Sequence, residues 1–423
     1  MKNVPFFKST SYGNNFVIVD ETRTPILTEP EKSGFAYQAT NINYGIGSDN
    51  FLIIQPCKPE ILKSIQKARR YWDDLPDART ADYIFRMFEP NGVEAFCCAN
   101  GLLCIAQYLN NRYGIESARV MTEIPTSKPK VVSIGTRSKS GTNWANLGHP
   151  RRISPKIADL SVTNPYDGVI DIIKNINITF RAHDLAPFSQ EQSLKITGYL
   201  VFTGEPHLIV FSDNGFSLKQ PSEMIFISSY QDSSKMEKIE KRVAFGSWLV
   251  HHIGNYLNNH YTHVFPAGMN INFVRVDKDA GSLEFRCFER GINRETLSCG
   301  TGALAVSFVA RQLNLVETDK IILWPHRCRW HDPEAQILVK KDRKGWLLHG
   351  NPIMLFEGVF AFPKMGNEQK NTLSFGKLCP GRKFNIGNQP FVMRFMRISS
   401  QRLIPFGSIS AVESIRKASG HII

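Results

Sequence analysis

The chain has 423 residues, 42% of them hydrophobic and 21% charged, with 51 lysines and arginines against 38 acidic residues. This length fits two domains better than one small core, and the composition is that of an ordinary globular protein. The chain has no run of about 18 uncharged apolar residues, and its eight cysteines include no Cys-x-x-Cys pair; this excludes a typical membrane span and predicts a cytoplasmic protein with reduced thiols and no membrane partner.

Short β-like runs dominate the chain, and helical patterns are fewer. Helices are expected at residues 58–71, directly after each of two repeated cysteines, and at 237–258 with an interruption near Gly246. Residues 125–155, rich in Ser, Lys, Gly, Thr and Pro, are expected to form a flexible insertion. Seven runs are β-branched or aromatic and bounded by Gly, Asn or Pro, so we expect them to be strands. They are residues 15–19, 51–54, 84–88, 199–202, 207–211, 271–276 and 283–288.

One pattern occurs twice along the chain. Residues 85–89 (FRMFE) return as residues 285–289 (FRCFE), an offset of 200 residues. Each copy is followed by a cysteine and a small-residue turn, Cys98 before Ala-Asn-Gly and Cys299 before Gly-Thr-Gly, and then by an apolar helical stretch. A second match upstream of each cysteine keeps the same order, so chance similarity of short β segments is a poor explanation. The duplication predicts two related halves.

The halves set the expected domain boundaries. We expect an N-terminal half of residues 1–124 plus about 350–363, a C-terminal half of residues 125–349, and a basic extension of residues 364–423. The extension holds ten lysines and arginines against two glutamates. No RNA- or DNA-binding motif accompanies this charge, so a solvated appendage is favoured and nucleic acid is not an expected partner.

The repeated cysteines suit proton transfer. A cysteine just before a helix meets unpaired backbone N–H groups and the positive end of the helix dipole, which favour its thiolate form. The same N–H groups can hold a substrate carboxylate. Two facing copies predict that one thiolate removes an α-proton while the other thiol delivers a proton to the opposite face. The remaining cysteines are expected to be structural, as small buried hydrophobes, at Cys57, Cys97, Cys104, Cys287, Cys328 and Cys379.

At these residues the sequence resembles the diaminopimelate epimerase family, over about residues 13–362. The resemblance implies a mixed α/β (α+β) fold of two pseudo-symmetric domains, each a curved mixed sheet or barrel around a central helix, with the active site in the cleft between them. It also implies inversion of amino-acid α-carbons without a cofactor. The motifs that carry it are residues 13–16 (GNNF), 45–50 (GIGSDN), 91–101, 204–207 (GEPH), 265–273 and 289–302.

The same resemblance implies roles for single residues. Cys98 and Cys299 would be the acid and base, while His207 and Glu289 would tune and orient the thiols. Substrate contacts would come from Asn14, Asn50, Asn100, Asn270 and Arg290, and from the backbone amides of Asn100, Gly101, Gly300 and Thr301.

Three departures from the family pattern bear on the substrate, the first being Leu103, which replaces an arginine shortly after the first cysteine motif. Glu89 and Glu205 stand where the family usually has asparagines that hold the far end of diaminopimelate. A carboxylate about 4 Å from a substrate carboxylate would repel it by roughly 4 kcal/mol at an effective dielectric near 20. We therefore expect both glutamates to contact a basic amino acid such as histidine, lysine, ornithine or arginine. The alternative is diaminopimelate itself, in the LL-to-meso step of lysine and peptidoglycan biosynthesis.

Other classes of protein are less consistent with the residues. No lysine stands out as a pyridoxal-phosphate Schiff base, and the clustered histidines at 251, 252, 260 and 263 lack a carboxylate at zincin spacing. We therefore expect no cofactor and no metal. A non-enzymatic binding protein is the second alternative, which the intact cysteine pair disfavours. The expected partner is an amino-acid substrate, and a homodimer stays open.

Overall fold

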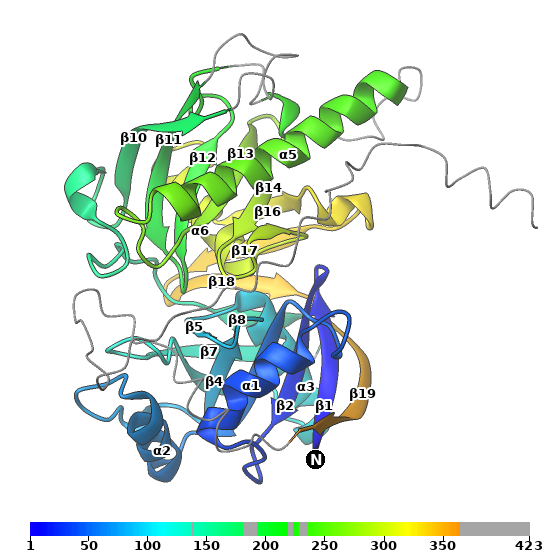
Figure 1. Cartoon of the computed structure of the whole chain (residues 1–423). Helices are drawn as coiled ribbons and strands as arrows, with labels where there is room; N and C mark the ends of the chain where they lie inside the picture. The colour runs from blue at the N-terminus through cyan, green and yellow to red at the C-terminus, as the bar shows by residue number, and fades with distance from the viewer. Residues whose placement is uncertain (138, 181–192, 219–222, 228–235, 364–423) are drawn as a thin grey trace, which may run out of the picture. The chain divides into compact units, whose positions relative to one another are not determined.

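The computed structural model describes residues 1–363 apart from 138, 181–192, 219–222 and 228–235 (Figure 1). The basic extension, including Cys379, lies outside the described residues. The described residues belong to one compact unit. None of the helices within these ranges is long and apolar enough to cross a membrane.

The N-terminal half is a mixed sheet whose strands pair in the order β19-β1-β2-β3-β4-β6-β7-β8. The pairs β2–β3 and β4–β6 are parallel and the others antiparallel. In Figure 1 the last strand, β19, lies beside the first, β1. The strands are β1 (Lys2–Ser11), β2 (Asn14–Asp20), β3 (Asn50–Pro56), β4 (Tyr83–Phe88), β6 (Ser117–Thr122), β7 (Lys130–Thr136), β8 (Asn143–Asn146) and β19 (Ile353–Phe362).

The C-terminal half repeats this strand order and these directions. Its strands pair in the order β10-β11-β12-β13-β14-β16-β17-β18, with β12–β13 and β14–β16 parallel. A short strand, β9 (Asn164–Pro165), pairs with β10, and β18 pairs with β8, which joins the two sheets. The strands are β10 (Asp171–Thr179), β11 (Ser193–Phe202), β12 (Pro206–Phe211), β13 (Asn270–Asp277), β14 (Ser282–Glu289), β16 (Lys320–Pro325), β17 (Ile337–Asp342) and β18 (Gly345–Gly350).

Each sheet curves around a central helix, α3 (Ala99–Tyr113) or α6 (Gly300–Gln312). Both helices are apolar on almost every face, and α6 is buried from Gly300 to Ala310, as expected for a helix enclosed by a sheet. On the outer faces, α1 (Glu29–Ala39) packs on β3, and α5 (Met236–His260) packs on β13 and β14 (Figure 1). A further helix, α2 (Pro59–Arg69), packs against α1. The expected fold is confirmed.

Two expectations about single segments are wrong. Residues 125–155 are not a plain flexible insertion, because they contain β7 and β8, which extend the sheet of the N-terminal half and not, as expected, the C-terminal half. Val132 and Ile134 of β7 alternate into the core and give the segment a buried face. The helix at residues 237–258 is present as α5, but Gly246 does not interrupt it. A Cβ at Gly246 would lie 2.2 Å from the Met224 carbonyl oxygen, so the glycine serves close packing.

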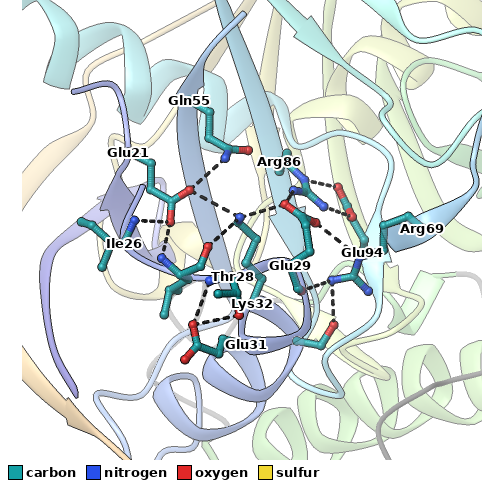
Figure 2. A network of polar contacts seen from close by, with 12 residues as sticks. Glu21, Ile26, Thr28, Glu29, Glu31, Lys32, Gln55, Arg69, Arg86 and Glu94 are labelled. Carbon is teal, nitrogen blue, oxygen red and sulfur yellow. Dashed lines mark hydrogen bonds and ion pairs between the residues drawn. The ribbon is translucent and has the colours of Figure 1, made fainter. Parts of the chain in front are cut away.

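The repeated arginine anchors the strand that leads to each cysteine. Arg86 is fully buried and donates from Nε and Nη2 to Glu94 of β5 (Glu94–Ala95), at 2.7 and 2.6 Å. It also donates to Glu29 at 2.6 Å, and Lys32 and Glu21 extend the same network (Figure 2). In the other half, Arg286 of β14 donates to Glu295 of β15 (Arg294–Thr296) at 2.6 and 2.7 Å.

Candidate active site

The two repeated cysteines have the same local geometry. Cys98 is the N-cap of α3, with φ −133° and ψ 113°, and Cys299 is the N-cap of α6, with φ −130° and ψ 117°. Each sulfur accepts a hydrogen bond at 3.4 Å from a glycine N–H three residues on, in Gly101 and Gly302 respectively. The sulfur therefore replaces the oxygen that usually caps a helix, and it meets the positive end of the helix dipole.

The two cysteine turns meet each other. A Cβ at Gly300 would lie 2.8 Å from both the Ala99 Cβ and the Asn100 Oδ1, so only glycine permits this approach of the two helix ends. A pocket with about 350 Å³ of empty space, its open mouth included, lies where the halves meet. The expected site residues that line it are Asn14, Asn50, Glu89, Cys98, Glu205, Asn270, Glu289, Arg290, Cys299, Gly300 and Thr301.

Three expected residues do not line this pocket. The Asn100 side chain donates to Ser298 Oγ at 3.2 Å, the Gly101 N–H is taken by Cys98, and His207 lies behind Thr301. Two other residues do line it. Met87 belongs to the repeated FRMFE segment, and this repeat was a signal in the sequence that could have identified it as a site residue. Cys97, which we had expected to be structural, reaches the pocket although it lacks the repeated turn.

His207 is connected to Cys299 through the Thr301 hydroxyl and not by direct contact. Burial lowers the pKa of His207 to about 3, so the imidazole is neutral. Its Nδ1 accepts from the Asn272 amide at 2.9 Å, and we therefore assign the proton to Nε2, which lies 3.1 Å from Thr301 Oγ1. The Thr301 hydroxyl can then donate to Cys299 Sγ at 3.4 Å.

The hydrogen bonds distinguish the two thiols. Asp49 accepts from the Asn14 amide nitrogen at 3.0 Å, which turns the Asn14 oxygen toward Cys98. The Cys98 thiol donates to that oxygen at 3.7 Å, which favours the protonated form, and burial raises its pKa well above the usual value. The pKa of Cys299 is lowered by hydrogen bonds from Cys287, Thr301 and the Gly302 N–H, against the effect of burial.

Asp49 also joins the halves, and we had not expected it as a site residue. Arg294 of the C-terminal half donates to Asp49 Oδ1 at 2.5 Å, while Asp49 Oδ2 accepts from the Asn14 side chain and the Asn15 N–H. The series of hydrogen bonds from Arg294 through Asp49 and Asn14 to Cys98 thus connects the position of one thiol to the opposite half. The only signal in the sequence was its place in the GIGSDN motif.

Glu89 and Glu205, the two glutamates that replace asparagines of the family pattern, have different environments. Glu205 is fully engaged: Oε1 accepts from the N–H groups of Phe96 and Cys97 at 3.0 and 3.1 Å, and Oε2 accepts from Arg290 Nε at 3.1 Å and from its Nη2. Glu89 accepts from the Asn50 amide at 2.9 Å and takes part in no ion pair within the part of the chain that the structure describes. Burial raises the pKa of Glu89 to about 8.

Glu289 lies beside Cys299, as the resemblance implied. Its Oε1 accepts from the Thr296 hydroxyl, and burial, followed by the proximity of Cys299, raises its pKa well above the usual value. Donor atoms of Cys287, Glu289 and Cys299 all lie within 4.8 Å of one another. Cys287, expected to be an isolated core cysteine, is therefore a neighbour of the repeated thiol.

The four clustered histidines serve aromatic packing. His252 stacks against Phe180 and Trp248 with ring centroids 4.8 and 5.0 Å away, and His260 stacks on Tyr256 at 4.3 Å. His263 stacks on Tyr261 at 5.6 Å, and His251 packs edge-on against Phe288. His251 faces the sheet, where its Nε2 accepts from the Glu295 N–H at 3.4 Å, and His260 and His263 are exposed at the end of α5.

Sequence comparison places the chain near one group of enzymes, although no family model matches it. It is 28% identical over 324 residues to a diaminopimelate epimerase of Methanothrix thermoacetophila, covering 75% of this chain and 84% of that protein. The diaminopimelate epimerase of Archaeoglobus fulgidus is 26% identical over 316 residues (74% and 83% covered), and that of Coxiella burnetii 26% over 327 residues (76% and 88%). The predicted resemblance, and with it the isomerase class, is confirmed.

Solved structures agree on the fold. A probable proline racemase from Agrobacterium radiobacter K84 matches with a TM-score of 0.53 and 10% identity, covering 87% of this chain and 95% of that one. A hydroxyproline epimerase from Agrobacterium vitis matches with a TM-score of 0.51 and 12% identity, covering 85% and 92%. At identities this low, the two matches show a shared fold and nothing more.

Proposed function

We propose that this protein is a cofactor-independent amino-acid racemase or epimerase that inverts the α-carbon with Cys98 and Cys299. The observation that supports it best is the pair of equivalent cysteine N-caps, one from each half, lining one pocket. The N–H groups at the start of α6, where Gly300 and Thr301 line the pocket, would receive the substrate carboxylate, because helix N-termini attract anions. The α-carbon would then lie between the sulfurs.

The hydrogen bonds support unequal starting roles for the thiols. Cys299, which receives hydrogen bonds, would start as the thiolate and remove the α-proton. Cys98, which donates to Asn14, would start as the thiol and protonate the opposite face. After one turnover Cys299 holds the proton and Cys98 is the thiolate, the form of the enzyme that accepts the other stereoisomer.

The charge at the far end of the pocket supports a substrate with a basic or hydrogen-bond-donating side chain, such as histidine, lysine, ornithine or arginine. Arg290 would attract a second substrate carboxylate, but Glu205 already neutralises it. Glu89 forms no ion pair in the described ranges, and its raised pKa makes it a hydrogen-bond partner below about pH 8 and a further carboxylate above it. Diaminopimelate is the second candidate, favoured by the names of the sequence relatives.

A panel of L-amino acids, incubated with the protein in D₂O, tests the proposal. We expect α-deuterium incorporation together with inversion, without added pyridoxal phosphate, and the fastest turnover with a basic amino acid. Turnover of diaminopimelate above all others would overturn the preference for a basic side chain but keep the reaction. Binding of amino acids with no α-proton exchange in any of them would overturn the reaction itself.

The raised pKa of Glu89 predicts a pH-dependent affinity. Below about pH 8 Glu89 is mostly protonated, and above it the carboxylate can pair with a cation. KM for arginine, whose side chain stays charged, should therefore fall by up to about tenfold between pH 7 and 9, because the binding-competent fraction rises by that factor. Glu89→Gln should raise KM and flatten this dependence. The same pH dependence in Glu89→Gln would assign it to another group.

A further inference from the structure

A third thiol lies next to one of the two repeated cysteines. Cys287 and Glu289 are alternate residues of β14, so their side chains project from the same face of the strand, toward the N-cap of α6. There the donor atoms of Cys287, Glu289 and Cys299 lie within 4.8 Å of one another. Both cysteines are buried and Glu289 is partly buried.

These donors are chemically suited to a soft divalent cation. Zinc and cadmium prefer thiolate sulfur and accept a carboxylate oxygen as a further ligand, at metal–ligand distances of about 2.0 to 2.3 Å for zinc. Among the residues that the structure describes, the Glu289 carboxylate accepts from the Thr296 hydroxyl and belongs to no ion pair. A cation would supply the positive charge that this carboxylate lacks.

We propose that Cys287, Glu289 and Cys299 form a binding site for one Zn²⁺ or Cd²⁺ ion, and that occupation of this site switches the enzyme off. Cys299 and Glu289 also line the pocket, which leaves the fourth ligand position open to water or to an amino-acid ligand. A metal-bound Cys299 sulfur cannot take a proton from the substrate. The inhibition rests on the proposed function, whereas the metal binding does not.

The site belongs to the C-terminal half alone. The repeat places Met87 of β4, and Glu89 directly after that strand, where β14 has Cys287 and Glu289. The N-terminal half therefore offers Cys98 a thioether in place of a second thiol. The sequence did not reveal the site, because Cys287 and Cys299 are 12 positions apart and have no familiar metal-ligand spacing.

Cadmium titration of the reduced full-length protein tests the site without any turnover. We expect one equivalent of Cd²⁺ to produce the ultraviolet thiolate-to-cadmium charge-transfer band, with Zn²⁺ competing and Mg²⁺ without effect. Cys287→Val should weaken Cd²⁺ binding by a factor of about ten or more, since even the loss of an outer-shell partner costs that much. Cys287→Ser, checked by circular dichroism, covers the case in which the valine variant does not fold.

The matched control is Cys104→Ala, which removes an equally buried thiol from α3 and should bind Cd²⁺ like the wild type. Unchanged binding by Cys287→Ser, or loss of the band in Cys98→Ser, would overturn the site. In the activity assay Zn²⁺ should inhibit the wild type, and a chelator should restore its activity. Half-inhibition of Cys287→Val, measured against that variant's own metal-free rate, should need at least about tenfold more Zn²⁺. Cadmium binding without racemisation of any amino acid would contradict the proposed function and leave the site intact.

Discussion

Replacing either Cys98 or Cys299 by alanine should reduce racemisation by about a thousandfold or more. Each direction of the reaction needs one thiolate as base and the other thiol as acid, and general acid–base groups commonly contribute factors of about 10² to 10⁴. In D₂O each single variant should still exchange the α-proton of one enantiomer. Cys98→Ala retains Cys299 as a base, so it should exchange the α-proton of one enantiomer without inverting it. Cys299→Ala should exchange only the opposite enantiomer.

Serine variants distinguish the acid–base role of each thiol from its role as the N-cap of a helix. In Cys98→Ser and Cys299→Ser a hydroxyl oxygen can still accept the N–H of Gly101 or Gly302, so the helix keeps its cap, but a hydroxyl is a much poorer acid–base group than a thiol. These variants should unfold like the wild type and be nearly inactive, while Cys104→Ala should stay active. Near-normal racemisation by any variant of Cys98 or Cys299 would contradict the two-thiol mechanism.

Arg86→Met should lower the free energy of unfolding by about 3 to 5 kcal/mol. Arg86 is completely buried and neutralises Glu29 and Glu94, so its loss leaves two buried carboxylates without their shared partner, which is the costly way to break a buried ion network. Urea unfolding followed by circular dichroism measures this as a lower midpoint. Because Glu94 belongs to the short strand before the Cys98 turn, racemisation should also fall at temperatures where the variant remains folded.

The matched control is Arg79→Ala. Arg79 forms its ion pair with Asp77 on the exposed surface, where water and salt screen the charges, so this variant should have the same urea midpoint as the wild type. An Arg86→Met midpoint equal to that of Arg79→Ala would show that Lys32 and Arg69, which also contact Glu29, compensate for the lost guanidinium.

Local patterns predicted the elements that carry the repeat. The β-branched runs at residues 51–54 and 271–276 became β3 and β13, and both cysteines stand at helix N-termini as expected. Local signals were insufficient where a segment owes its structure to distant partners. Residues 125–155 as a whole look like a loop by composition, yet the short run at 130–136 forms β7 because β6 and β8 provide the hydrogen bonds and the core covers Val132 and Ile134.

The sequence by itself determined the two-half architecture and the pair of thiols, because a duplicated strand–turn–helix unit is a local pattern that each half forms with its own backbone. Only the tertiary structure decided how the site is charged. Glu205 neutralises Arg290, Glu89 forms no ion pair in the described ranges, and Cys287 lies beside Cys299. These are contacts between side chains on different elements, and their distances depend on how strands and helices pack rather than on any spacing along the chain.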